Sequence, residues 1–235
     1  MMALNRPAVN YGYDLATITQ GAEVFTYSYD SLSRRSSLQR PNGVNTSYAY
    51  DEVNRLKRLT HANSVGNIED LQYSYNLNDE ISAITSLNSP TILPTAKTAT
   101  PANAANRISQ VGTVNYSFDN HGQTTSKTNA NGTTNYSWDA RGRLTKATLP
   151  NGQSVDYGFD ALGRRASRTA GSTTTGFLYD GDDVVADKVG ANVTADYLHG
   201  AGVDEHLRQS NAQGNLYFTQ DHLLTFTPKP FFPKK

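Results

Sequence analysis

The feature that most constrains how this chain can fold is a short pattern that recurs along nearly its whole length, an aromatic residue followed directly by an aspartate. The pair is found at Tyr13-Asp14, Tyr29-Asp30, Tyr50-Asp51, Phe118-Asp119, Trp138-Asp139, Phe159-Asp160 and Tyr179-Asp180, and Tyr75-Asn76 is a close relative. The last four aspartates lie 20, 21 and 20 residues apart, and the earlier gaps are 16, 21 and 25 residues. Such a period is typical of repeat proteins, in which each copy is one small supersecondary unit.

The residues before each aspartate alternate between large and small side chains. Val155, Tyr157 and Phe159 share one face of an extended chain, whereas Gly158 falls on the other. The same alternation recurs at Phe25, Tyr27 and Tyr29, at Leu71, Tyr73 and Tyr75, at Val114, Tyr116 and Phe118, and at Thr134, Tyr136 and Trp138. A period of two is the signature of a half-buried β-strand. We therefore expect the aromatic face to pack against neighbouring copies.

The residues from each aspartate onward predict a tight turn. Aspartate at the first position of a type I turn can accept a hydrogen bond from the backbone N–H two residues on. The third residue after it is one that tolerates a left-handed backbone, with a strained serine in one copy. These positions are Ser33, Asn54, Asn106, Gly122, Gly142 and Gly163. A second turn in the repeat is marked by Asn-Gly pairs, a strong hairpin signal, at 42–43, 131–132 and 151–152.

Each repeat is thus predicted to be strand, turn, strand and turn. About nine copies would give about sixteen to eighteen strands in one long antiparallel meander sheet, which curls or spirals because every strand pair twists. The 43-residue gap between Asn76 and Asp119 contains a copy without aromatics, Asn103 to Ile108, and an irregular Pro/Thr-rich insertion near 86–102. A weak helical signal from Asp51 to His61 is the alternative to strand in that segment.

Composition narrows the class of protein. Lys+Arg and Asp+Glu balance at 21 each, and this balance argues against binding to nucleic acid or to a charged membrane surface. The chain has no cysteine, which excludes disulfides, thiolate metal sites and cysteine nucleophiles. No apolar run approaches the length of a membrane-spanning helix, and the first residues lack the apolar core of a signal peptide.

The repeated charges are better explained by structure than by chemistry. General acid–base catalysis needs two groups that converge on one substrate, whereas carboxylates spaced along a meander form a row. Turn capping is therefore the favoured role of the aspartates, with calcium binding as the alternative. Arginines recur four residues after the aspartate position and are expected to lie over a neighbouring ring or to pair with the turn aspartate, with an anionic glycan as the alternative partner. These are Arg34, Arg55, Arg107, Arg143 and Arg164.

The remaining titratable residues show no ligand pattern. The acidic clusters Asp182-Asp183 and Asp204-Glu205-His206 lack the spacing of a zinc or EF-hand site. The five histidines are scattered, at 61, 121, 199, 206 and 222. No serine elbow or phosphate-binding loop is present. We therefore expect no catalytic, cofactor or metal site, no enzyme activity, and a structural role for the aromatic–aspartate positions.

The repeated segments YSYDSLSRR, YAYDEVNRL, YSWDARGRL and YGFDALGRR resemble the YD repeat of RHS (rearrangement hotspot) proteins. The resemblance runs from about Tyr11 to His222. It implies repeats that wind as a β-ribbon into a hollow shell, which in polymorphic toxins encloses a C-terminal toxin segment. Older descriptions of the family also associate the repeat with binding of carbohydrate or heparin.

The chain departs from the family pattern near its end. After Asp221-His222-Leu223 the family usually continues with Gly-Ser into a self-cleaving core, whereas this chain reads LTFTPKPFFPKK. The sequence therefore predicts a YD/RHS repeat region over 1–222 and a divergent, disordered tail over 223–235. It also suggests a truncated fragment of a larger RHS product that lacks the core and the toxin.

The resulting functional hypothesis is a structural segment of a β-shell that encapsulates toxin cargo in a secreted polymorphic toxin. Its expected partners are the rest of the shell and the cargo, and isolated chains are expected to self-associate through exposed strand edges. The expected location is outside the cell or at its surface as part of a larger product, or the cytoplasm if the chain is made alone. The alternative is a cell-surface or extracellular carbohydrate-binding adhesion module.

Overall fold

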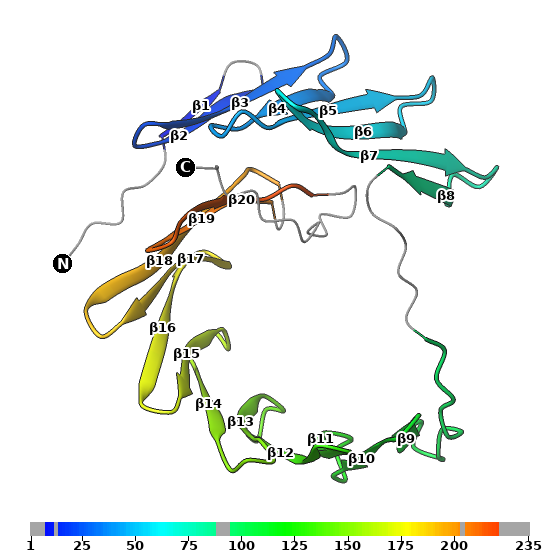
Figure 1. Cartoon of the computed structure of the whole chain (residues 1–235), viewed down its shortest axis with the longest axis vertical. Coiled ribbons are helices and arrows are strands. Elements are labelled where there is room, and N and C mark those ends of the chain that lie inside the picture. Colours follow the sequence, from blue (N-terminus) through cyan, green and yellow to red (C-terminus); the bar gives the residue numbers. More distant parts are fainter. Residues whose placement is uncertain (1–7, 12–13, 88–94, 203–204, 221–235) are drawn as a thin grey trace. The chain divides into compact units, whose positions relative to one another are not determined.

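The structure, a computed structural model, describes residues 8–11, 14–87, 95–202 and 205–220 (Figure 1). These residues form twenty strands and no helix, so the all-β prediction is confirmed and the helical alternative over Asp51 to His61 is wrong. The described residues contain no helix that could cross a membrane. Every strand pairs antiparallel with a neighbour in sequence, which confirms a meander of hairpins.

The strands belong to two sheets rather than to one sheet of sixteen to eighteen strands. The first sheet has eight strands in sequence order: β1 (Ala8–Tyr11), β2 (Leu15–Gln20), β3 (Glu23–Tyr29), β4 (Arg35–Gln39), β5 (Asn45–Tyr50), β6 (Leu56–Asn63), β7 (Gly66–Tyr75) and β8 (Ile81–Ser86).

The second sheet has twelve strands, also in sequence order: β9 (Gln110–Val111), β10 (Val114–Phe118), β11 (Thr124–Asn129), β12 (Gly132–Trp138), β13 (Leu144–Thr148), β14 (Ser154–Phe159), β15 (Arg165–Ala170), β16 (Thr173–Asp180), β17 (Asp183–Val189), β18 (Asn192–His199), β19 (His206–Asn211) and β20 (Gly214–Tyr217).

The two sheets are separated where the sequence predicts the Pro/Thr-rich insertion. Part of that insertion, 88–94, lies outside the described residues. The remainder contributes one isolated bridge, between Ala99 and Val111. Proline has no backbone N–H to donate to a ladder, so a segment rich in proline interrupts the meander.

Burial follows the alternation read from the sequence. In β3 the side chains of Phe25 and Tyr27 are buried, whereas Thr26 and Ser28 between them are exposed. In β7, Leu71 and Tyr73 are buried in the same way. One face of each hairpin is therefore aromatic and the other is small and polar.

Each hairpin whose first strand ends in the aromatic residue of the repeat also carries a β-bulge at the same place. Tyr29 pairs with Arg35 while Ser28 pairs with Ser37, so Ser36 is an extra residue in β4. The register shifts again directly before Tyr50, Tyr75, Phe118, Trp138, Phe159 and Tyr179. Because a bulge increases the local right-handed twist, its recurrence adds twist at every repeat.

The chain divides into two compact units, and the first consists of residues 1–92 and 196–235. Its core combines residues of β2 to β4 with residues of β18 to β20: Leu15, Ile18, Phe25, Tyr27, Leu38, Leu198, Leu207 and Tyr217. The rings of Phe25 and Tyr217 lie 6.0 Å apart between centroids. The first sheet therefore packs on the C-terminal strands of the same unit.

A polar network lies beside this core. The buried Arg208 side chain forms ion pairs with Glu23 and Asp196. Glu23 also accepts hydrogen bonds from the Tyr217 hydroxyl and, at 2.6 Å, from the Asn215 side chain. Burial, together with the hydrogen bond to Glu23, raises the pKa of Tyr217 to about 12. The network joins β3 to β18, β19 and β20.

The second unit, residues 93–195, is built differently. Among its described residues only Ala186 and Ala195 are buried. Its aromatic residues, such as Tyr136 and Trp138 in β12, are half-buried on one face of a single sheet layer. The cross-strand pairing of neighbouring repeats, rather than a two-layer core, accounts for the burial that its aromatic face has.

Removal of one core side chain should therefore destabilise the first unit selectively. Phe25 is fully buried, and we expect Phe25→Ala to lower the free energy of unfolding by about 3–5 kcal/mol, through lost burial and the cavity left behind. Leu32, whose side chain is 63% exposed, provides the control. Leu32→Ala should change stability by no more than about 0.5 kcal/mol. Urea unfolding followed by circular dichroism checks both, and equal effects would contradict this core assignment.

Candidate functional site: the repeated turn

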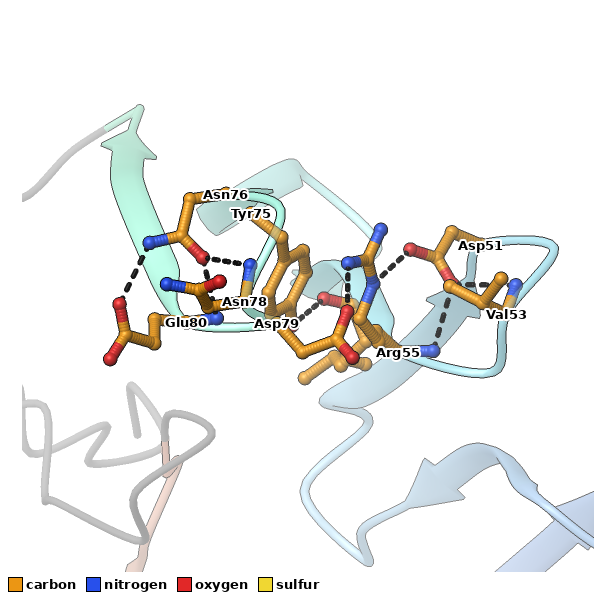
Figure 2. Close-up of polar contacts among 9 residues, drawn as sticks. Asp51, Val53, Arg55, Tyr75, Asn76, Asn78, Asp79 and Glu80 are labelled. Carbon is orange, nitrogen blue, oxygen red and sulfur yellow. Dashed lines mark hydrogen bonds and ion pairs between the residues drawn. The ribbon is translucent and has the colours of Figure 1, made fainter.

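The residues after each strand's last aromatic form a three-residue loop, seen best at Asp51. The Asp51 N–H donates to the Arg55 carbonyl at 2.9 Å, and the Asn54 N–H donates to the Asp51 carbonyl at 3.1 Å. Asn54 has a φ of 70°, in the left-handed region. Asp51 Oδ1 accepts two further bonds, from the N–H of Val53 at 3.0 Å and of Arg55 at 2.8 Å (Figure 2). One side-chain oxygen thus satisfies two backbone donors of the loop.

Seven loops share this geometry. In each, the side-chain oxygen of the first residue accepts the N–H of the fourth residue after it, and the third residue has a positive φ. The first residues are Asp30, Asp51, Asn76, Asn103, Asp119, Asp139 and Asp160. The left-handed residues are Ser33, Asn54, Asp79, Asn106, Gly122, Gly142 and Gly163. The copy at Asn103 has lost its aromatics but keeps the whole turn.

The arginine four residues after the aspartate returns to the same carboxylate. Arg55 Nε donates to Asp51 Oδ2 at 2.7 Å. The same pair forms in three other copies, Arg34 with Asp30, Arg143 with Asp139 and Arg164 with Asp160. The arginine hydrogen bond lowers the pKa of Asp30 and of Asp160 below the usual carboxyl value. In Asp139 the backbone N–H of Arg143 is the largest cause of the same lowering.

The guanidinium group of each of these arginines also lies over the aromatic residue that precedes the next turn. Arg55 Cζ is 4.5 Å from the centre of the Tyr75 ring (Figure 2). Equivalent contacts of 4.4 to 4.6 Å join Arg34 to Tyr50, Arg143 to Phe159 and Arg164 to Tyr179. A partly exposed cation–π contact contributes about 0.5–1 kcal/mol, so the arginine links one repeat to the next. The expected position over a neighbouring ring is confirmed for these four arginines, whereas Arg107 binds a backbone carbonyl instead.

The polar tip of the same aromatic residue makes a further bond to the preceding repeat. Tyr75 donates its hydroxyl to the Leu56 carbonyl at 2.7 Å, and Tyr50 donates to the Arg35 carbonyl at 2.9 Å. Trp138 Nε1 and the Tyr179 hydroxyl donate in the same way to the carbonyls of Thr124 and Arg165. In all four the acceptor is the fifth residue after the preceding first turn residue. Tyrosine and tryptophan fit this position because they combine a packing ring with a donor.

The outer guanidinium nitrogen extends the link to the next loop itself. Arg34 Nη1 donates to Asn54 Oδ1 at 2.7 Å, and Arg55 Nη1 donates to Asp79 Oδ1 at 2.6 Å. Both acceptors are the left-handed residues of the following turns. We call this whole set of contacts the arginine clamp: the arginine, its turn aspartate, and the next repeat's aromatic and loop.

Three copies depart from the clamp while keeping the turn. At Asn76 the donor and acceptor are exchanged, because the Asn76 Nδ2–H donates to Glu80 at 2.8 Å (Figure 2). Gln123 stands in place of arginine after Asp119. Arg107, which follows an asparagine, donates instead to the Asp119 carbonyl at 2.6 Å.

The two terminal copies differ from the expected turn. Tyr13 lies outside the described residues, and Asp14 directly precedes β2. Tyr11, which pairs with Leu15 beside a bulge, occupies the backbone position that Tyr29 has in the next hairpin. Asp180 is the last residue of β16, opposite Asp183, because a two-residue Gly181–Asp182 loop replaces the three-residue one. In all three Asn-Gly turns, at 42–43, 131–132 and 151–152, only the glycine has a positive φ.

The five turn carboxylates therefore lie one to a turn, and each accepts a backbone N–H of its own loop: Asp30, Asp51, Asp119, Asp139 and Asp160. Across residues 8–11, 14–87, 95–202 and 205–220, no three His, Asp or Glu side chains gather where they could hold a metal ion. Two interacting residues were missed in the sequence, Arg35 and Arg165, which directly follow clamp arginines. They lie over Tyr27 and Tyr157 at 4.7 and 4.8 Å. The sequence feature that indicates these two residues is the pair of adjacent arginines that ends YSYDSLSRR and YGFDALGRR.

The strained serine offers a direct test of the turn. Ser33 has a φ of 56°, in the region where a Cβ is unfavourable. We expect Ser33→Gly to raise the free energy of unfolding by about 1 kcal/mol, the cost of a non-glycine residue in this region. Ser31→Gly, in the same loop but without a positive φ, should lower stability instead. Thermal unfolding of both variants checks this, and destabilisation by Ser33→Gly would contradict the assigned strain.

The lowered pKa values predict acid sensitivity. A carboxylate whose pKa is lower in the folded state stabilises the fold above its unfolded pKa, and that contribution is lost as the pH falls through the folded value. We expect the melting temperature to fall as the pH drops from about 5 to about 3. The variant Asp139→Asn, Asp160→Asn should melt lower at neutral pH but show a shallower pH dependence. Asp182→Asn is the control for charge removal, and equal pH dependence in all three proteins would contradict the prediction.

The family described as Teneurin YD-shell matches residues 26–183, more than half of the chain. A search of curated protein sequences finds no match. The matched range includes all seven first turn residues, from Asp30 to Asp160, and every arginine clamp.

Solved structures support the same fold. A structure of the Photorhabdus luminescens Tc holotoxin pore with a mutated TccC3 matches 91% of this chain with a TM-score of 0.55 and 13% identity. The crystal structure of TcdB2-TccC3 without its hypervariable C-terminal region matches 94% of it with a TM-score of 0.57 and 15% identity. The chain spans only 15% and 16% of the lengths of those chains. The family match over the repeats identifies this chain as a member of the Teneurin YD-shell family.

Proposed function

We propose that the chain is a non-enzymatic wall segment of a YD-repeat shell, and that the shell belongs to a larger secreted product and encloses a toxin segment of it. The observation that carries the proposal is the arginine clamp. It joins each repeat to the next by contacts that recur from copy to copy, for example from Arg55 to Tyr75 and from Arg143 to Phe159. Such a unit extends a sheet hairpin by hairpin, as a wall requires.

The placement of the charged groups supports a structural role over catalysis. Each turn carboxylate accepts backbone N–H groups of its own loop, and its remaining oxygen pairs with the clamp arginine in four copies. The carboxylates therefore do not converge on one substrate position, as general acid–base catalysis needs. The second unit is a single sheet layer whose aromatic face is only half-buried. This partial exposure further supports a wall segment whose aromatic face contacts other parts of the shell.

Protection of a cargo segment from protease is the experiment that tests the role in containment. The longer product that contains this chain is expressed with a protease site engineered into the segment expected inside. We expect that site to be cut slowly in the intact product and rapidly when Phe25→Ala opens the wall. The same site appended to the isolated chain is the control for intrinsic cleavage. Equal cutting in all three proteins would contradict containment.

The properties of the isolated chain give an independent check. A wall segment without its neighbours leaves unpaired strand edges, at β1 and β8 for example, so we expect self-association in light scattering. Purified chain should also keep its mass on incubation, and self-cleavage would overturn the non-enzymatic assignment. A specific hit on a glycan array that Arg143→Met abolishes would instead favour a carbohydrate-binding module.

A further inference from the structure

A cavity of about 390 Å³ lies in the first unit. Its walls are the rings of Tyr48, Tyr50 and Tyr75 and the side chains of Leu38, Leu56 and Leu59, with polar groups from Arg35, Arg40, Glu205 and Gln220. This volume and this mixture of apolar walls with a few polar groups are typical of small-molecule sites. The repeated turns do not use the cavity's charged groups, so the proposed wall function leaves them unexplained.

The first charged pair in the cavity is internally neutralised. Arg35 Nη1 lies 2.5 Å from Glu205 Oε1, and its Nη2 lies 3.3 Å from Oε2. The Gly202 N–H donates to Glu205 Oε2 at 3.0 Å. A side chain at Gly200 would collide with the same carboxylate, so the two glycines make room for it. Glu205, which is only 2% exposed, is therefore fixed on Arg35.

Arg40, the second guanidinium group of the cavity, is held by uncharged groups. It is 4% exposed, and its Nε donates to the Phe218 carbonyl at 3.0 Å while Nη1 donates to Thr46 Oγ1 at 2.6 Å. Within the described part of the chain no carboxylate pairs with it, although a buried cation normally requires one. Burial lowers the pKa of Arg40, but arginine stays protonated in proteins. Among its described lining residues, the cavity thus has two guanidinium groups and one carboxylate, a net charge of +1.

The neighbours of Arg40 hold it in place without neutralising it. Thr46 Oγ1 accepts the Arg40 N–H and lies 2.8 Å from Nδ1 of the fully buried His61. His61 Nε2 lies 3.2 Å from the Gln220 carbonyl oxygen. Neither the Thr46 hydroxyl nor the imidazole carries a negative charge that could neutralise Arg40. The hydroxyl of Tyr27, packed under Arg35, is buried without a hydrogen-bond partner in the described residues.

From this geometry we propose that the cavity is a binding site for an organic carboxylate with an apolar or aromatic body, whose carboxylate pairs with Arg40. The guanidinium group presents unused N–H donors in a planar fork that matches a carboxylate. The tyrosine and leucine walls would bury the rest of the ligand. Inorganic phosphate shares the charge but not the apolar body. The carboxylate could belong to a free small molecule or to the C-terminus of a peptide, because both present the same group.

The test measures binding to the full chain by isothermal titration calorimetry. Benzoate is the probe, benzamide is its neutral isostere, and inorganic phosphate is the anion without an apolar body. A short peptide that ends in phenylalanine, with a free or an amidated C-terminus, distinguishes the peptide source. We expect benzoate to bind and benzamide not to bind. Saturating benzoate should also raise the melting temperature, because it binds only the folded chain.

Variants with opposite charge effects locate the site. Arg40→Met should weaken benzoate binding at least about tenfold, the loss expected for a charge-assisted hydrogen bond. Glu205→Gln raises the net charge of the cavity and should strengthen binding. Arg168→Met, at an exposed arginine in the second unit, is the matched control and should leave binding unchanged.

Several results would overturn the proposal. They are absence of benzoate binding to the folded chain, equal binding of benzamide, and phosphate binding as tight as that of benzoate. Benzoate binding that Arg40→Met leaves unchanged would also overturn it. Should Arg40→Met fail to fold by circular dichroism, the Glu205→Gln variant decides: unchanged or weaker benzoate binding in that variant contradicts the assignment.

Discussion

The whole architecture depends on one side-chain oxygen at the start of each loop, which accepts two backbone N–H groups. That oxygen fixes a three-residue loop with a left-handed third residue, as at Asp51 and Asn54. The loop length sets the pairing register of the two strands that it joins. Register then decides which face receives the aromatic residues, since a slip of one residue would move all of them to the opposite face. The geometry of the turn therefore determines which side chains can pack together.

The same repeat yields two kinds of unit because packing partners differ. In the first unit the aromatic face of β3 meets Leu198, Leu207 and Tyr217, and its residues are buried. In the second unit equivalent residues such as Tyr157 and Phe159 are only half-buried. Because these side chains are buried more completely in the first unit, the hydrophobic contribution to its stability is larger. The clamp matters relatively more in the second, where Arg143 and Arg164 tie neighbouring hairpins together.

The sequence predicted what is local and periodic. Strand faces, the residues of the three-residue loop and the position of arginines over rings all follow from patterns within about 25 residues of chain. It failed where the outcome depends on loop length or on distant segments. The pair Tyr179-Asp180 looks like every other copy, yet the glycine after it permits a two-residue loop. Arg40 contacts Phe218, 178 positions away, and Arg35 contacts Glu205, 170 positions away. No local sequence pattern predicts these contacts.

The imperfect copies rank the interactions of the repeat. Asn103 lacks the strand aromatics and the carboxylate, yet its loop keeps both backbone bonds and both side-chain bonds. Asp119 lacks a clamp arginine and its loop is also intact. At Asn76 the bond between first and fifth residues survives with donor and acceptor exchanged, because Glu80 supplies the oxygen and the amide supplies the proton. An acceptor oxygen and a left-handed third residue are therefore sufficient for the turn, and charge is an addition. The arginine clamp joins turns that form without it, so its loss in one copy need not interrupt the sheet.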